Sequence, residues 1–358
     1  MNIYVNRRAR STPMTATTIP MTGFSRGRAA WSAVAALGIA ASLSSPTALA
    51  DETRWTVPRT SDGQPDLQGY WTNNTVIPLE RPAALGDKAF FTEEEVTLFM
   101  KERLVPEETE AGTTADVHYQ LTDFALDHSQ NTVNVNMRTS LITDPPDGRM
   151  PAPLPAALTK AKERTDYSRV HAFDSVQTRP LGERCIIWAH EGPPIIPVGY
   201  NSNLRIFQSP GYVVIQTEML PDARIVPLDG RPHLSSGVRQ WLGDSRGRWE
   251  GTTLIVETTN YTGRTGVRGS TPNLLLSEAA RVTERFERTG EDTIRYQFTV
   301  EDPNTWDRPW SGEYAMTRIE GPMFEYACHE GNYGLANTLS GARAEERAAA
   351  EAAKRDAR

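Results

Sequence analysis

The chain has 358 residues, a formal net charge of −7, and acidic and basic residues that are interspersed along it without a long basic run. Proteins that bind nucleic acid usually carry such a run or a basic patch, so we expect no nucleic acid partner. The length allows one large β domain or two domains of ordinary size.

Residues 1–50 have the pattern of a leader segment. Arg26 and Arg28 precede the apolar stretch AAWSAVAALGIAASL, and the sequence ALA that ends at Ala50 has the small-x-small pattern of a cleavage site. The apolar stretch is shorter than the roughly 20 residues that cross a bilayer, so we expect no membrane anchor. The pattern predicts a signal peptide cleaved after Ala50 and a mature protein that is periplasmic or secreted.

Residues 51–110 are predicted to form an extended arm and a helix. The arm, up to residue 90, is rich in Pro, Gly and Asp. Thr92 and Glu95 have the spacing of a capping box, and the stretch EEEVTLFMKERL that surrounds Glu95 has helical periodicity. A second, short helix is expected around residues 156–164.

Residues 111–341 are predicted to form an antiparallel β domain. From Cys185 onward, β-branched and aromatic residues alternate with polar ones in LRIFQ, YVVIQTEML, RIVPLD, VRQWLG, WEGTTLIVETTNY, RVTERFER, TIRYQFTVED, GEYAMTRI and MFEYACHE. The turn signals SPG, PDA, DSRGR, RTGED and EGP separate these segments. Short connections favour antiparallel neighbours. We expect a mainly β fold, with a meander that forms a barrel (lipocalin-like or related) or a sandwich, a few peripheral helices, and a charged helical tail at residues 342–358.

Four stretches carry a resemblance to known proteins: DLQGYWTNNTVIPLERP, PLDGRPHL, RQWLGDSRGRWEGTTLIVETTNY and YACHEGNYGLANTLSGARAEE. Together they resemble a family of uncharacterised secreted bacterial proteins that are usually labelled hypothetical. The resemblance covers nearly all of the mature chain and implies export and a common fold, but no catalytic residue. The segment GDSRGRWEGTTLIVET also resembles a hairpin of lipocalin-type barrels.

The two cysteines of the chain, Cys185 and Cys328, each lie close to a His-Glu-Gly sequence. Export permits a disulfide, and with two cysteines this is the one pairing available. A bridge would draw towards one region the two His-Glu pairs, His190-Glu191 and His329-Glu330.

Three interpretations of these pairs stay open: a metal site, an acid/base site, or hydrogen-bonded histidines of an ordinary β fold. Neighbouring residues on a strand point to opposite faces, and neither pair has the His-x-x-x-His spacing of a helical zinc site, so we predict no metal. Histidine and carboxyl groups exchange protons near neutral pH. The candidate catalytic residues are His190, Glu191, Arg224, His233, His329 and Glu330.

Polar and aromatic residues near the same motifs predict a small polar or aromatic ligand, such as a sugar derivative. The candidates are Trp188, Tyr200, Asn201, Asn203, Asn332 and Tyr333. No glycine-rich loop opens a helix, so we expect no cofactor; nothing in the sequence indicates an oligomeric state. Two functions follow: an exported lyase or hydrolase that uses His/Glu acid-base chemistry, or a non-catalytic small-molecule-binding protein of the cell envelope.

Overall fold

The computed structural model describes residues 55–104, 136–188, 191–197, 201–220, 222–266 and 275–358. The chain divides into two units, Met1–Thr53 and Arg54–Arg358, and the described residues all belong to the second. The predicted leader and the first part of the predicted β domain, residues 111–135, lie outside them.

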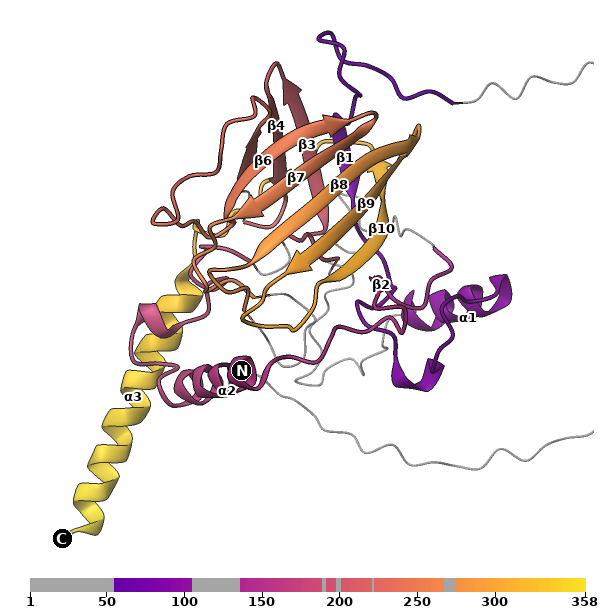
Figure 1. Ribbon diagram of the computed structural model, residues 1–358. Coiled ribbons are helices and arrows are strands. Elements are labelled where there is room, and N and C mark those ends of the chain that lie inside the picture. Colours follow the sequence, from indigo (N-terminus) through magenta and orange to yellow (C-terminus); the bar gives the residue numbers. More distant parts are fainter. Residues whose placement is uncertain (1–54, 105–135, 189–190, 198–200, 221, 267–274) are drawn as a thin grey trace, which may run out of the picture. The chain divides into compact units, whose positions relative to one another are not determined.

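The described residues form a ten-stranded antiparallel sheet and three α-helices (Figure 1). The strands follow the sheet order β5-β4-β3-β1-β10-β9-β8-β7-β6, and β2 pairs with β10 beside this path. The mainly β, antiparallel prediction with peripheral helices is therefore confirmed. The strands are β1 (Gly69–Thr72), β2 (Ile142–Asp144), β3 (Asn203–Ser209), β4 (Tyr212–Thr217), β5 (Ala223–Pro227), β6 (Asp244–Glu250), β7 (Thr253–Thr259), β8 (Arg281–Gly290), β9 (Thr293–Glu301) and β10 (Trp310–Ile319).

The helices are α1 (Glu93–Leu104), α2 (Pro155–Val170) and α3 (Tyr333–Asp356), with short 3-10 turns η1 (Ala83–Leu85) and η3 (Val176–Thr178). The expected capping box opens α1: Thr92 N donates to Glu95 Oε2 at 2.8 Å, and Glu95 N donates to Thr92 Oγ1 at 3.2 Å. Helix α3 begins at Tyr333, earlier than the predicted tail helix at 342, because Asn332 caps it through Leu335 N.

The two ends of the sheet, β5 and β6, approach each other without pairing. Among the described residues no backbone ladder joins them, yet a Cβ atom placed on Gly247 of β6 would lie 2.7 Å from Val226 Cγ1 of β5. We call this unpaired junction between β5 and β6 the seam. The sheet thus curves until its ends meet through side chains, but it is not closed, so the barrel prediction is not confirmed and a sandwich-like arrangement is compatible with it.

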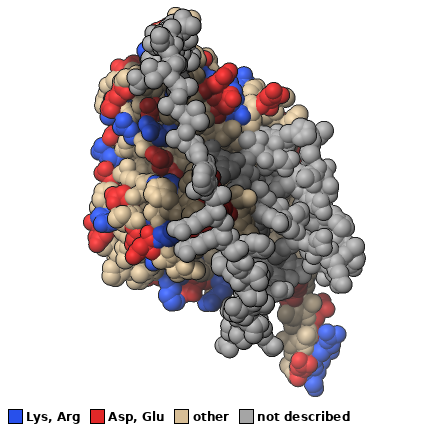
Figure 2. Space-filling model, turned by 90° about the vertical axis from the view of Figure 1, so that its right-hand side faces the viewer, with Lys and Arg blue, Asp and Glu red and all other residues tan. Residues whose placement is uncertain are grey.

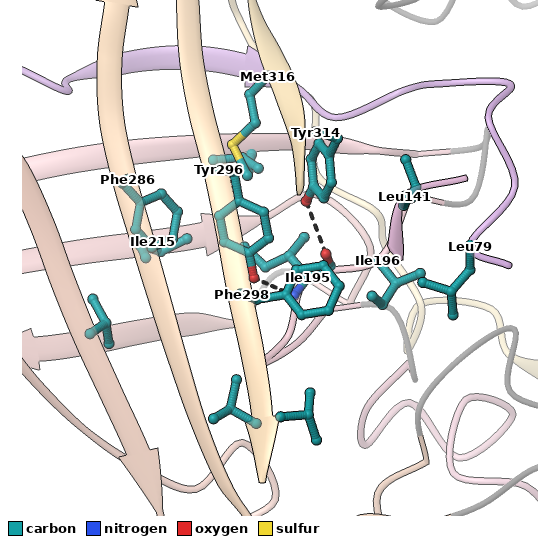
Figure 3. Packing of buried hydrophobic residues seen from close by; sticks show 14 of the residues in the cluster. Leu79, Leu141, Ile195, Ile196, Ile215, Phe286, Tyr296, Phe298, Tyr314 and Met316 are labelled. Carbon is teal, nitrogen blue, oxygen red and sulfur yellow. Dashed lines mark hydrogen bonds between the residues drawn. The ribbon is translucent and has the colours of Figure 1, made fainter. Parts of the chain in front are cut away.

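Strict alternation on β8, β9 and β10 builds the interior of this curved sheet. On β9, Ile294, Tyr296, Phe298 and Val300 are buried, while the residues between them are exposed or half-buried. Aromatic rings pack across strands, with Tyr296 centred 5.0 Å from Phe286 and 4.9 Å from Tyr314 (Figure 3). Such cross-strand aromatic pairs stabilise the sheet beyond the area that they bury.

The segment predicted as an extended arm contributes β1, which lies between β3 and β10 with Trp71 fully buried. Three predictions about other segments were wrong. DSRGR is part of β6 and not a turn, because the reversal falls at residues 251–252. VRQWLG makes a single bridge, from Gln240 to Tyr261, and is no strand. MFEYACHE has no strand either.

A proline-rich segment, residues 191–197, enters the interior, and we call it the proline loop. Its Ile195 is held from both sides, since Ile195 N donates to Tyr296 Oη at 2.9 Å and Tyr314 Oη donates to Ile195 O at 2.9 Å (Figure 3). Tyr261 Oη donates to Pro193 O at 3.3 Å. Tyrosine hydroxyls therefore satisfy buried backbone groups of this loop, which forms no strand.

Candidate functional site

A pocket of about 440 Å³ opens at one end of the seam. Its walls are residues 222–225, where β5 begins, and residues 239–245, which lead into β6. Unpaired strand ends at a sheet junction leave space that side chains do not fill. The pocket therefore exists because the sheet is not closed there.

Charged groups dominate the pocket wall. Arg239 Nη2 lies 3.1 Å from Glu278 Oε2, and Asp244 Oδ1 lies 2.7 Å from Arg246 Nη1. Asp222 is exposed, and among the described residues its carboxylate makes no ion pair. Gln240 and the half-buried indole of Trp241 complete a polar wall with one aromatic surface.

Arg224 reaches from the pocket into the interior, where it forms a bidentate ion pair with Glu284 of β8, with Nη2 at 3.0 Å from Oε1. Burial by itself would lower the pKa of Arg224, but the Glu284 carboxylate more than offsets it and raises the pKa. Tyr296 Oη also donates to Glu284 Oε1 at 2.8 Å, and burial with the Glu284 charge raises the pKa of Tyr296 well above its usual value. Arg224, a predicted catalytic residue, is thus paired with Glu284 and is not free to meet a ligand anion.

Glu191, at the start of the proline loop, is 3% exposed. Its Oε2 accepts from Trp188 N at 3.1 Å, whereas the buried Oε1 has no hydrogen-bond partner among the residues that the structure describes. Burial, and then the Asp222 charge, raise the pKa of Glu191 to about 8, while the hydrogen bond from Trp188 opposes this rise. Glu191 is therefore a carboxylic acid that keeps its proton at neutral pH. The charge of Asp222 in the pocket wall contributes to its raised pKa.

His233 lies beside the pocket, in a network of ionisable side chains. Its Nδ1 is 2.9 Å from Asp244 Oδ2, and its Nε2 is 3.2 Å from Glu257 Oε1. Arg281 Nη1 extends the network to Glu257 Oε2 at 2.7 Å. Both ring nitrogens of His233 thus have carboxylate partners within the protein.

The second His-Glu-Gly sequence lies apart from the pocket wall. His329, Glu330, Asn332 and Tyr333 are exposed, Tyr333 at 74%. They precede or begin α3, so the alternation of a strand does not apply to them. Among the described residues the pocket wall includes none of them.

The predicted disulfide joins Cys185 to Cys328, with Cα atoms 5.8 Å apart. Asn332 Nδ2 donates to Glu183 O at 3.3 Å, beside this bridge. The disulfide thus connects the segment that leads to Glu191 with the N-terminus of α3. Of the described members of the two His-Glu pairs, Glu191, His329 and Glu330, none belongs to the pocket wall.

The other candidates for ligand binding are scattered. Trp188 is half-buried and holds Glu191 through its backbone, Asn201 is half-buried, and Asn203 is buried on β3. None of these three belongs to the pocket wall. His190 and Tyr200 lie outside the described residues. Three residues of the pocket wall, Arg239, Gln240 and Trp241, were not among the predicted site residues. Trp241 lies in VRQWLG, whose pattern suggested a strand and not a site.

Within the described part of the chain, no group of three or more His, Cys, Asp or Glu side chains is arranged to hold a metal ion. None of the helices described there is long and apolar enough to cross a membrane. On the face shown in Figure 2, Lys and Arg side chains are interspersed with Asp and Glu.

Comparisons with protein-family models, curated proteins and solved structures gave no match.

Proposed function

We propose that this protein is exported, binds a small polar molecule in the seam pocket and acts on it by acid-base chemistry of the lyase or hydrolase type. The observation that carries the proposal is Glu191, a buried carboxylic acid with one oxygen that has no hydrogen-bond partner among the described residues. Glu191 does not itself line the pocket; the charge of Asp222 in the pocket wall, which helps to raise the pKa of Glu191, is the link between the two. Carboxyl groups with a perturbed pKa are typical of catalytic sites.

The chemistry assigns different roles to the two carboxyl groups. Glu191 keeps its proton at neutral pH and supplies it to a leaving group, as a general acid does. Asp222, exposed at the pocket wall, is the acceptor for a proton from the ligand or from water. Two carboxyl groups in contrasting surroundings are the usual means of running acid and base steps in one site.

Two supporting features concern the surroundings of the site. The Cys185–Cys328 disulfide fits an oxidising compartment outside the cytoplasm. A lipocalin-like barrel left open at the seam is the finer fold that we propose, because it accounts for a pocket at the junction of the sheet ends.

A second candidate is a non-catalytic binding protein of the envelope. This candidate is favoured because other ionisable groups already have partners within the protein. Both ring nitrogens of His233 and both terminal nitrogens of Arg224 contact carboxylates. A pocket in which three of the four charged wall residues are held in fixed pairs is suited to recognition rather than turnover.

Ligand-detected NMR with a panel of neutral, amino and acidic monosaccharides and small phenols separates the two candidates. Each compound that binds is then incubated with the protein and followed by proton NMR for product. We expect product formation by the wild type, and a rate about 10²-fold or more lower in Glu191→Gln with binding retained. Glu330→Gln, a change at an exposed carboxyl, is the control and should keep the wild-type rate. Binding with no product from any compound would replace the enzyme with the binding protein.

A further inference from the structure

The charges of the seam pocket do not cancel. Of its four charged wall residues, three have opposite partners: Arg224 with Glu284, Arg239 with Glu278, and Asp244 with Arg246. The fourth, Asp222, has no ion-pair partner among the described residues. The uncompensated charge of the pocket is therefore negative and is located at one carboxylate.

The Asp222 carboxylate has capacity for a further donor. Its Oδ1 accepts from the neighbouring Ala223 N at 2.8 Å, and the described part of the chain offers no donor to Oδ2. An ionised carboxylate accepts several hydrogen bonds. The Asp222 charge also helps to raise the pKa of Glu191, after burial, which indicates that its negative potential extends into the protein.

The opposite kind of ligand is disfavoured. An anionic ligand would need a free guanidinium, but Arg224 and Arg239 are neutralised by their own carboxylates. It would also meet the Asp222 charge without compensation. Trp241, in contrast, offers an aromatic surface in the same wall, and such surfaces attract cations.

We propose, building on the small-molecule site described above, that the seam pocket selects ligands that carry a protonated amine, held by the Asp222 carboxylate next to Trp241. Gln240 in the same wall is suited to hydroxyl groups of the ligand. The ligand class is a small amine with a polar skeleton, such as an amino sugar.

Glucosamine and glucose form a matched pair of probes, since they differ by an ammonium group in place of one hydroxyl. Their dissociation constants are measured by calorimetry with the full chain at neutral pH and low salt. We expect glucosamine to bind about fivefold more tightly, the size of an ion pair at an exposed carboxylate. Asp222→Asn should abolish this preference, and about 0.5 M sodium chloride should reduce it.

Asp229→Asn is the matched control, because Asp229 is an exposed carboxylate that pairs with Arg231 and lies outside the pocket wall; it should leave the preference unchanged. Equal affinity for the two sugars, lost together in Trp241→Ala, would overturn the preference for amines while leaving the proposed function standing. A glucosamine preference that survives in Asp222→Asn would overturn the role of Asp222. If neither sugar binds, the inference fails, while the wider panel of compounds still decides the proposed function.

Discussion

Arg224 and Glu284 form a buried ion pair although five strands separate β5 from β8 in the order of the sheet. The pair can form only because the sheet curves back on itself. Neither side chain is more than 6% exposed, and Glu284 also accepts a hydrogen bond from Tyr296. The pair therefore connects the pocket wall with the interior that holds the proline loop.

We predict that Glu284→Gln lowers the free energy of unfolding by about 3–5 kcal/mol, because it leaves the Arg224 charge buried without a partner. Urea denaturation at neutral pH measures the loss. Glu250→Gln is the control: Glu250 pairs with Arg248 at the surface, and its loss should change the free energy by less than about 1 kcal/mol. The double variant Arg224→Met with Glu284→Met should recover part of the stability, since no unpaired charge remains. Equal effects of Glu284→Gln and Glu250→Gln would contradict the buried pair.

The strands were predictable where local pattern decides them. Alternation on β8, β9 and β10 and the turn at RTGED depend on neighbouring residues, so the sequence indicates them directly. The contact between Arg224 and Glu284 depends on how many strands the sheet has and how strongly it curves. Those are long-range properties that no local pattern contains, and β1 was missed for the same reason, since GYWT forms a strand only because β3 and β10 flank it.

The hydrogen bonds that hold Ile195 of the proline loop give a second prediction. Tyr296→Phe leaves Ile195 N–H without its acceptor, and Tyr314→Phe leaves Ile195 C=O without its donor, both in the interior. Each unsatisfied buried group should cost about 1–3 kcal/mol in unfolding free energy. Tyr333→Phe, at an exposed tyrosine, should change nothing measurable. Wild-type stability in both Tyr296→Phe and Tyr314→Phe would show that the loop is not held through Ile195.

The disulfide gives a third prediction. Non-reducing peptide mapping of the purified protein should recover the Cys185 and Cys328 peptides linked. A bridge across a sequence separation of 143 residues restricts the unfolded chain strongly, so its loss in the Cys185→Ser, Cys328→Ser variant should lower the free energy of unfolding by about 2–5 kcal/mol. A reducing agent should have the same effect on the wild type and none on the variant. Free thiols on both cysteines of the oxidised protein would contradict the bridge.

The candidate functional site was harder to predict than the Cys185–Cys328 disulfide. Counting cysteines predicts the Cys185–Cys328 pairing, but the predicted roles of His329 and Glu330 depended on a strand that does not form there. Glu191 is buried at the start of the proline loop, whereas Glu330 is exposed just before α3. Two glutamates, each followed by glycine, thus lie in unlike surroundings. Burial strongly affects the pKa of a carboxyl group, and it is set by the tertiary fold.

The last prediction concerns the proton of Glu191. Its carboxyl has a pKa of about 8 in the folded protein and about 4.5 as an ordinary glutamate. Between these values the unfolded chain loses the proton and the folded chain keeps it, so the folded state binds more protons and its stability falls as the pH rises. The slope is at most about 1.4 kcal/mol per pH unit. Below this window both states are protonated and above it both are ionised, so Glu191 adds no pH dependence there.

Glu191→Gln removes this titration while keeping the size of the side chain. Urea unfolding at several pH values from about 5 to about 8 should therefore show the variant gaining stability over the wild type, by about 3–4 kcal/mol across the window. Glu330→Gln is the matched control, because Glu330 is exposed in the second His-Glu-Gly sequence, and its pH profile should follow that of the wild type. If Glu191→Gln also follows the wild-type profile, Glu191 is ionised in the folded protein at neutral pH, and its role as a proton donor is lost with it.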